Sequence, residues 1–275
     1  MPKTALGRGS PLPLTVLPDS DAVIARFADD LLAQYRAARG AGRCPVVFIV
    51  PVGPVGQFDL LARRCNAEGE SLRDLVLVNM DEYLTADGRD WIPTSDPLSF
   101  RRHMAAHFYD LLEPGLAPPP DQRVFPHPRD PDAIGRRIAG WGGVDVCFGG
   151  VGITGHLAFN DPPESGEEVS LSEFRVRPTR VVRLARETVV INAVTGARGN
   201  LERIPKLAVT VGMQEILDSR KVRIYMNRPW QAAIVRKILH GPVTPAVPAS
   251  LLQTHPDAHL TIADYVGEPP EPELR

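Results

Sequence analysis

Two adjacent acids at the end of a hydrophobic segment are the first residues that could do chemistry. Residues 74–80 read DLVLVNM, a pattern typical of a strand buried on both faces, and Asp81 and Glu82 follow it directly. A carboxylate in this position is partly removed from water, which raises its pKa and makes it a better proton-abstracting base. The same acids would also suit a helix cap or ion pairs with arginines, so the residues alone leave both interpretations open.

A glycine-rich loop is the second candidate. Residues 148–162 read FGGVGITGHLAFNDP, in which four glycines precede His156, Asn160 and Asp161. Glycines let the backbone approach a ligand closely and offer N–H groups to an anion or a hydroxyl. A dinucleotide-binding loop would open a helix, whereas these glycines lead to two prolines, so that class is excluded. A tight turn around a structural histidine would explain the same composition.

Alternating strands and helices must position these loops. A short apolar run at 12–17 comes first. Strands are predicted at 44–51, 74–80, 144–148, 206–211, 222–226 and 259–262, and helices at 22–40, 57–66, 98–112, 132–139, 213–218, 230–239 and 248–254. This alternation predicts a mainly parallel sheet with helices on both faces, a three-layer α/β sandwich. With no repeat or linker, we expect one domain over 1–275. Ligands bind beyond the carboxyl ends of such strands, so loops 51–57, 80–83 and 149–161 should meet there.

Composition narrows the function classes. The 275 residues carry 31 basic and 33 acidic side chains, a net charge of -2, which favours neither nucleic acid nor an anionic membrane as partner. Three cysteines without metal-ligand spacing, no apolar leader and no membrane-spanning run predict a cytoplasmic protein. Only four lysines are present, so few positions can supply a lysine–phosphate contact.

The two motifs together resemble a known family. NMDEY at 79–83, followed by the G-x-G-x-x-GH-x-AFN loop, is similar to the glucosamine-6-phosphate deaminase family, whose wider superfamily includes 6-phosphogluconolactonases. Segments 201–224 and 250–264 support the resemblance, which covers roughly residues 12–264 apart from an apparent insertion near 163–175. NMDEY and AFN favour the deaminase branch over the lactonase branch.

The resemblance implies a Rossmann-like fold, a homo-oligomer and sugar chemistry that needs neither metal nor organic cofactor. His156 would open the sugar ring, Asp81 would move a proton between C2 and C1, and Asp161 would orient His156. Glu82 is a second-rank catalytic candidate. Backbone groups of the glycine loop, from Gly149, Gly150, Val151 and Gly152, would hold sugar oxygens, with Asn160 beside them.

Two departures from the family fall beside His156. Thr154 stands where the family has an aspartate, and Asp161 stands where it usually has a glutamate. Thr154 can form hydrogen bonds but carries no charge at neutral pH. The carboxylate support around His156 is therefore expected to fall from two groups to one.

The phosphate site departs further. Loop 51–57 reads PVGPVGQ, so Gly53 is retained without the Ser or Thr of the family's phosphate loop. Trp230 falls where the family has a phosphate-binding lysine, and Val194 falls near its phosphate-binding arginine. Arg228 and Arg198 are the nearest cations that could substitute. A phosphate dianion is usually bound by several charged donors, so the sequence leaves open whether the substrate carries a phosphate at this end.

Three interpretations follow. The chain is a working sugar isomerase or deaminase whose substrate ends differently, a deaminase with relocated phosphate ligands, or a non-catalytic relative that binds a sugar or sugar phosphate. Lactone hydrolysis is the alternative reaction, in which His156 activates water and Asp81 has no step. The predicted substrate-binding set comprises Gly53, Gly149, Gly150, Val151, Gly152, Asn160, Arg228, Trp230 and Arg198.

Overall fold

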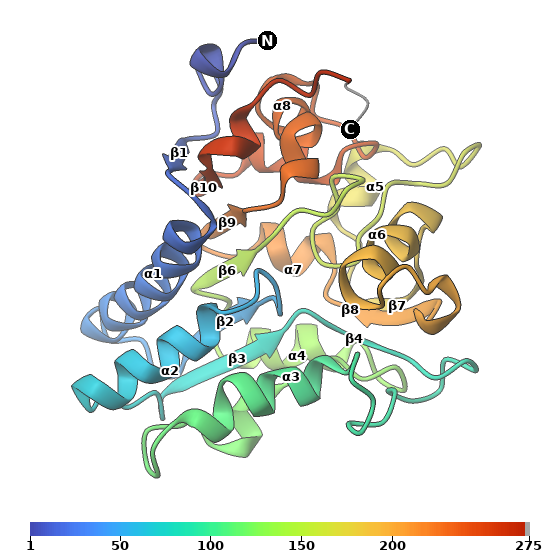
Figure 1. Ribbon diagram of the computed structural model, residues 1–275. Coiled ribbons are helices and arrows are strands. Elements are labelled where there is room, and N and C mark those ends of the chain that lie inside the picture. The colour runs from blue at the N-terminus through green and yellow to red at the C-terminus, as the bar shows by residue number, and fades with distance from the viewer. Residues whose placement is uncertain (273–275) are drawn as a thin grey trace.

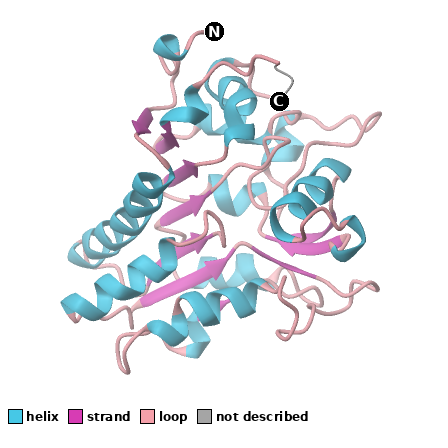
Figure 2. Ribbon diagram, viewed as in Figure 1, coloured by secondary structure: helices cyan, strands magenta, loops and turns pink. Residues whose placement is uncertain are grey.

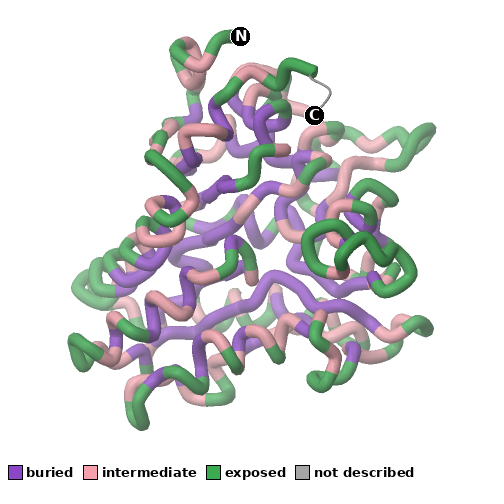
Figure 3. Tube along the Cα trace, in the orientation of Figure 1, coloured by how far each residue is buried: buried purple, intermediate pink, exposed green. Residues whose placement is uncertain are grey.

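The computed structural model describes residues 1–272, and within them a central sheet of seven parallel strands organises the chain (Figure 1). Its order is β1 (Leu14–Leu17), β10 (Ala258–Ala263), β9 (Val222–Met226), β6 (Val146–Gly149), β2 (Val46–Val50), β3 (Leu75–Asn79) and β5 (Arg123–Val124). Every residue of β2 and β3 is buried, as their continuous apolar patterns predict, and Figure 3 shows the buried trace running along the strands.

Helices cover both faces of this sheet. Figure 1 shows α1 (Ser20–Gly40), α2 (Gln57–Glu68) and α3 (Phe100–His107) on one side and α4 (Ala133–Gly140) and α7 (Met213–Leu217) on the other. Helix α8 (Ala232–His240) joins β9 to β10, and α5 (Leu171–Arg175) is a single turn. The predicted three-layer α/β architecture is confirmed. The segment expected as a helix at 248–254 forms a 3-10 helix, Pro248–Thr254.

A smaller antiparallel sheet stands beside the first one (Figure 2). It consists of β4 (Asp81–Tyr83), β8 (Leu207–Thr210) and β7 (Arg180–Arg183), and α6 (Arg186–Gly196) accompanies it. The side chains between them form a separate buried cluster that includes Tyr83, Leu184 and Ala208. The strand predicted at 206–211 therefore exists, but its assignment to the parallel alternation was wrong, since β8 pairs antiparallel with both of its neighbours.

Met80 takes part in the hydrogen bonding of both sheets. Met80 donates its N–H to Val50 O at 2.9 Å on the parallel side, and its carbonyl accepts from Val211 N at 2.7 Å on the antiparallel side. Asp81, the next residue, pairs with Thr210 in the small sheet. The carboxyl end of β3 thus leads directly into the strand that carries the predicted base.

None of the helices described in residues 1–272 has the length and apolar character needed to span a membrane.

Candidate active site

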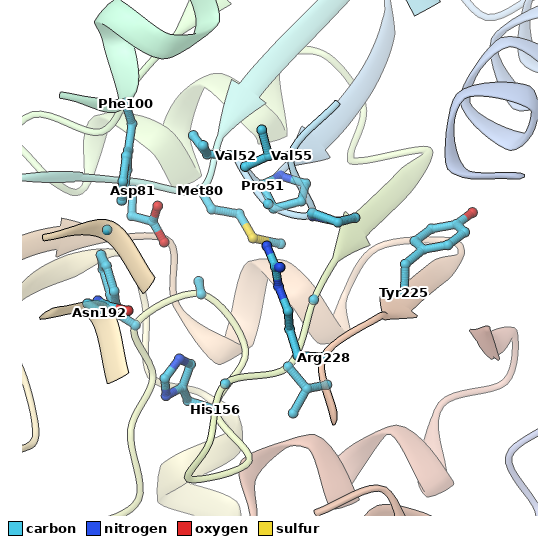
Figure 4. A pocket seen from close by; sticks show the side chains of 18 of the residues that line it. Pro51, Val52, Val55, Met80, Asp81, Phe100, His156, Asn192, Tyr225 and Arg228 are labelled. Carbon is cyan, nitrogen blue, oxygen red and sulfur yellow. The ribbon is translucent and has the colours of Figure 1, made fainter. Parts of the chain in front are cut away.

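A cavity of about 330 Å³ opens at the carboxyl ends of the parallel strands (Figure 4). Three of its walls are the loop after β2, the junction between β3 and β4, and the glycine loop after β6. These are the three loops that the sequence predicts to meet. Helix α6 adds Asn192, and the turn before α8 adds Arg228 and Gln231. Further lining residues include Leu98, Phe100, Ile204 and Tyr225.

Asp81 projects into this cavity from the first residue of β4 (Figure 4). The residue is 9% exposed, and none of the described residues donates a hydrogen bond to its carboxylate. Burial, reinforced by the negative charge of Glu82, raises the pKa of Asp81 to about 8. A carboxylate with this pKa is, when ionised, a stronger base than an ordinary carboxylate, and the cavity gives it direct access to a bound molecule.

Glu82 points away from the cavity and anchors a helix. Its fully buried carboxylate accepts hydrogen bonds from Ser99 Oγ at 2.8 Å and from the backbone N–H groups of Phe100 at 3.0 Å and Arg101 at 2.9 Å. Arg101 Nε lies 3.2 Å away as well. These donors belong to the first turn of α3, where a negative charge is favourable. The catalytic candidacy of Glu82 is therefore replaced by a structural role, because every one of its contacts is internal.

His156 lies in the cavity with one ring nitrogen held from behind. Its Nδ1 lies 2.7 Å from Asp161 Oδ1, and Thr154 Oγ1 lies 2.9 Å from the same nitrogen. Thr154 and Thr188 also donate to Asp161 Oδ1, at 3.0 and 2.7 Å, and Ala185 N donates to Oδ2 at 3.1 Å. Burial opposes ionisation of Asp161, but the contacts with His156, Thr188 and Ala185 outweigh it and lower its pKa to about 2. The carboxylate thus fixes Nδ1 and leaves Nε2 for a ligand.

Gly152 fits tightly against that free nitrogen. A β-carbon on Gly152 would lie 1.9 Å from His156 Nε2, so only glycine lets the ring occupy its place. Gly53, Gly150 and Val151 line the cavity too, as predicted. Gly149, the last residue of β6, lies behind this layer, where an added β-carbon would meet Ile224 at 3.1 Å.

Asn160 does not reach the cavity. It is fully buried, its amide donates to the carbonyls of Leu157 and Val211 at 2.9 Å, and its Oδ1 accepts from Arg180 at 2.7 Å. The predicted substrate contact of Asn160 is therefore corrected to a structural one, since these bonds tie the end of the glycine loop to the small sheet.

Known proteins resemble this chain in sequence and in fold. No protein-family model matches the sequence. The chain is 29% identical over 253 residues to glucosamine-6-phosphate deaminase of Porphyromonas gingivalis, with 88% of each chain covered. It is 30% identical over 213 residues to glucosamine-6-phosphate deaminase of Lachnoclostridium phytofermentans, with 74% of this chain and 80% of the relative covered.

The chain belongs to the glucosamine-6-phosphate deaminase family. Its fold agrees. The structure matches that of a monomeric glucosamine-6-phosphate deaminase with a TM-score of 0.77 at 24% identity, over 93% of this chain and 98% of the other. A 6-phosphogluconolactonase from Trypanosoma cruzi follows with a TM-score of 0.64 at 14% identity, over 93% and 95%. The predicted resemblance is confirmed.

The residues considered for the family's phosphate site differ in whether they line the cavity. Arg228 lines the cavity, whereas Trp230 and Arg198 are absent from its lining. Arg198 lies exposed just beyond the end of α6, and Val194 is 61% exposed on that helix. The predicted substrate contacts of Trp230 and Arg198 are therefore corrected, because their side chains do not form the walls of this cavity.

Three further residues were missed by sequence reasoning. Thr188 supports Asp161, Asn192 donates to Tyr83 Oη at 2.9 Å at the edge of the cavity, and Gln231 donates to Val151 O at 2.7 Å. Thr188 and Asn192 belong to α6, a helix that the sequence does not predict. Gln231 directly follows Trp230, so only the local turn shows which of these neighbours faces inward.

Proposed function

We propose that this member of the family is an enzyme that converts a 2-amino aldose into a ketose and ammonia. The observation that carries the proposal is that Asp81 and His156 face one cavity, the first as an unpartnered buried carboxylate and the second with Nε2 free. A base and an acid–base pair on one substrate are what ring opening followed by proton transfer requires.

In the first step His156 opens the ring. Its Nε2 takes the proton of the C1 hydroxyl and returns a proton to the ring oxygen, which breaks the bond between C1 and that oxygen and leaves an aldehyde. The contact between Asp161 and Nδ1 supports this exchange, because it keeps the second ring nitrogen in one protonation state while Nε2 cycles.

In the second step ionised Asp81 removes the proton from C2. The electron pair moves onto the C1 carbonyl oxygen, which takes a proton from the ammonium group on C2, and this gives an enol that carries the amine on C2. Asp81 then returns its proton to C1, which gives a C1 alcohol and a C2 iminium group. Water then adds to C2 and ammonia leaves, so the sum is amino aldose plus water to ketose plus ammonia. The proposed steps use only side chains of the protein.

The test measures ammonia and ketose for Asp81→Asn in parallel with the wild type. We expect a fall in turnover of ~10³-fold, since a positioned base contributes ~10²–10⁴-fold. In D₂O, the wild-type product should carry deuterium at C1 because the transferred proton exchanges on Asp81. Asp110→Asn is the matched control, since Asp110 is exposed on the 3-10 helix after α3.

Two outcomes would contradict the proposal. Lactone hydrolysis that survives Asp81→Asn would identify a lactonase, in which His156 activates water. Binding of sugars by the wild type without turnover of any of them would identify a non-catalytic relative.

A further inference from the structure

Two polar side chains of the cavity have no step in the proposed chemistry. Tyr83 and Asn192 both line it, and Asn192 Nδ2 donates to Tyr83 Oη at 2.9 Å. None of the described residues donates a hydrogen bond to Asn192 Oδ1, and none accepts the hydroxyl proton of Tyr83. The two side chains therefore hold each other and still offer an acceptor oxygen to a bound molecule.

Strand β4 places Tyr83 beside the proposed base. Side chains two residues apart on a strand point to the same face, so Asp81 and Tyr83 face the cavity while Glu82 between them faces α3. Burial raises the pKa of the Tyr83 phenol above its usual range, and the negative charge of Asp81 adds to this shift. The phenol therefore keeps its proton at neutral pH and is a neutral hydrogen-bond partner for Asn192.

Helix α6 supplies Asn192 from the other side. Asn192 follows Thr188 by four residues, so both side chains project from the same face of the helix. Thr188 Oγ1 lies 3.3 Å from His156 Nδ1, whereas Asn192 contacts Tyr83. One face of α6 therefore serves both the proposed ring-opening group and the pair formed by Tyr83 and Asn192.

The oxygens at this end of the cavity favour a group that is rich in donors. Figure 4 shows Asp81 and Asn192 on one side of the cavity and Arg228 across from them. Neither the carboxylate of Asp81 nor Oδ1 of Asn192 accepts a hydrogen bond from a described residue. Three acceptor oxygens thus stand beside the hydroxyl donor of Tyr83. Acceptors that are partly removed from water are best satisfied by a cation that donates hydrogen bonds.

We propose that Asn192 binds the nitrogen on C2 of the substrate as an ammonium group, with Tyr83 as the positioning residue that turns Oδ1 toward the cavity; this inference rests on the proposed function for the placement of C2 beside Asp81. An ammonium group has three donors and no acceptor, so it matches the oxygens of Asp81 and Asn192. A hydroxyl group on C2 brings one donor and no charge and gains less there. The pair therefore selects a 2-amino sugar over the corresponding 2-hydroxy sugar.

The experiment is a binding titration at about pH 8, which needs no turnover. The probes are open-chain hexitol 6-phosphates that carry an ammonium group, a hydroxyl group or hydrogen at C2, so they differ only at that carbon. The same set without phosphate is measured in parallel. We expect the wild type to bind the amino probe ~10–100-fold more tightly than the hydroxyl probe, the usual contribution of a hydrogen bond to a charged group.

Variants at Asn192 assign the effect to its oxygen. Asn192→Leu keeps the approximate size and removes both polar atoms, so it should reduce the amino preference by ~10-fold. Asn192→Asp keeps an acceptor oxygen and adds a negative charge, so it should maintain or raise the preference. The affinity for the probe with hydrogen at C2 should stay unchanged in both variants, which shows that the cavity is intact.

Tyr83→Phe tests the positioning role. It removes the partner of Asn192 Nδ2 and should reduce the amino preference by ~3–10-fold, the value of one neutral hydrogen bond. Thr195→Val is the matched control, because Thr195 is exposed on α6 and lies outside the lining of the cavity. It should leave the affinities for all probes unchanged.

Three results would overturn the inference: equal binding of the amino and hydroxyl probes by the wild type, an amino preference that survives Asn192→Leu, or a loss in Asn192→Asp as large as in Asn192→Leu. The two proposals fail separately. If no amino sugar turns over but the amino preference depends on Asn192, the inference stands and the proposed reaction falls. If amino sugars turn over and the preference survives Asn192→Leu, the reaction stands and the inference falls.

Discussion

Asp161 Oδ1 lies 2.7 Å from His156 Nδ1, and the same oxygen accepts hydrogen bonds from two threonines while Oδ2 accepts from Ala185 N. Both oxygens of this carboxylate therefore face donors. An amide in its place would turn an NH₂ group toward a donor in either orientation. We predict that Asp161→Asn lowers kcat by ~10²–10⁴-fold, the range for loss of an oriented acid–base group.

The test compares the steady-state kcat of Asp161→Asn on the cyclic sugar with its kcat on an open-chain substrate. Loss confined to the cyclic sugar would locate the defect in ring opening by His156. A variant with wild-type kcat on the cyclic sugar would refute the role of Asp161.

Thr188 is a positioning residue in the same network. Its Oγ1 donates to Asp161 Oδ1 at 2.7 Å and lies 3.3 Å from His156 Nδ1. Thr188→Val keeps the shape and removes the hydroxyl, so we predict a ~10-fold loss of kcat, the typical value of one hydrogen bond to a charged group. Thr188→Ser should restore the rate. The pH–rate profile is the deciding readout, because a residue with only a packing role would leave its shape unchanged.

Gly152 is required by the position of the imidazole. Since an added β-carbon would lie 1.9 Å from His156 Nε2, Gly152→Ala must displace the ring. We predict a loss of ~10²-fold or more in kcat, as for other small misplacements of a catalytic group. Gly140→Ala is the control, because nothing lies within 4 Å of the added carbon there. Full activity of Gly152→Ala would show that Nε2 does not act on the substrate.

The pH dependence of the enzyme should follow Asp81. The group must be ionised to act as a base and its pKa is raised to about 8, so kcat/KM should rise with pH and level off above that value. The profile is measured with the proposed amino aldose between pH 6 and pH 10. A flat profile across this range would rule out Asp81 as the titrating base.

The stability of the folded protein should fall as pH rises, whereas kcat/KM rises. The pKa of Asp81 in the folded protein is about 8, above the ordinary value of 3.8, so folding favours the protonated form, and stability falls as pH rises from about 4 to about 8. Asp81→Asn removes the charge permanently. Thermal melts should therefore show the variant close to wild type at about pH 4 and clearly more stable at pH 9, by ~2–4 °C for each kcal/mol gained. A difference that shrinks with rising pH would contradict this.

Glu82 should behave as a structural acid. Phe100 N donates to Glu82 Oε1, whereas Ser99 Oγ and Arg101 N donate to Oε2, so the NH₂ group of Glu82→Gln faces a donor in either orientation. We predict a loss of ~2–4 kcal/mol in unfolding free energy, measured by denaturant titration. The folded fraction should keep a kcat near that of the wild type. A large fall in kcat at unchanged stability would instead restore Glu82 as a catalytic candidate.

The sequence predicts those features of the fold that depend on neighbouring residues alone. The run that predicts a strand at 44–51 contains β2, Val46–Val50, because a strand buried on both faces needs continuous apolar residues. The meeting of the three loops follows from the carboxyl-end rule for parallel strands. Asp81 and His156 meet in the cavity because each directly follows, or lies in the loop after, one of those strands.

The remainder depends on contacts between distant parts of the chain. Residue type alone does not distinguish the adjacent acids Asp81 and Glu82, and only the family resemblance favours Asp81 as the base. The structure separates them, because donors of α3 bind the carboxylate of Glu82. Helix α6 was missed because it is rich in β-branched residues, which favour strands. Arg228 and Trp230 differ in role because the intervening 3-10 turn presents only one of them to the cavity.

Met80 couples the relative position of the two sheets to the position of Asp81. Its N–H belongs to the parallel sheet and its carbonyl to the antiparallel one, and Asp81 is the next residue. The direct connection from β3 to β4 therefore runs through the peptide that aims the proposed base, so a rotation of one sheet against the other is expected to move that base. Substitutions in the buried cluster beneath α6, for example at Leu184 or Ala208, should therefore shift Asp81 and slow proton abstraction from C2. They would change the rate without replacing a residue of the cavity wall.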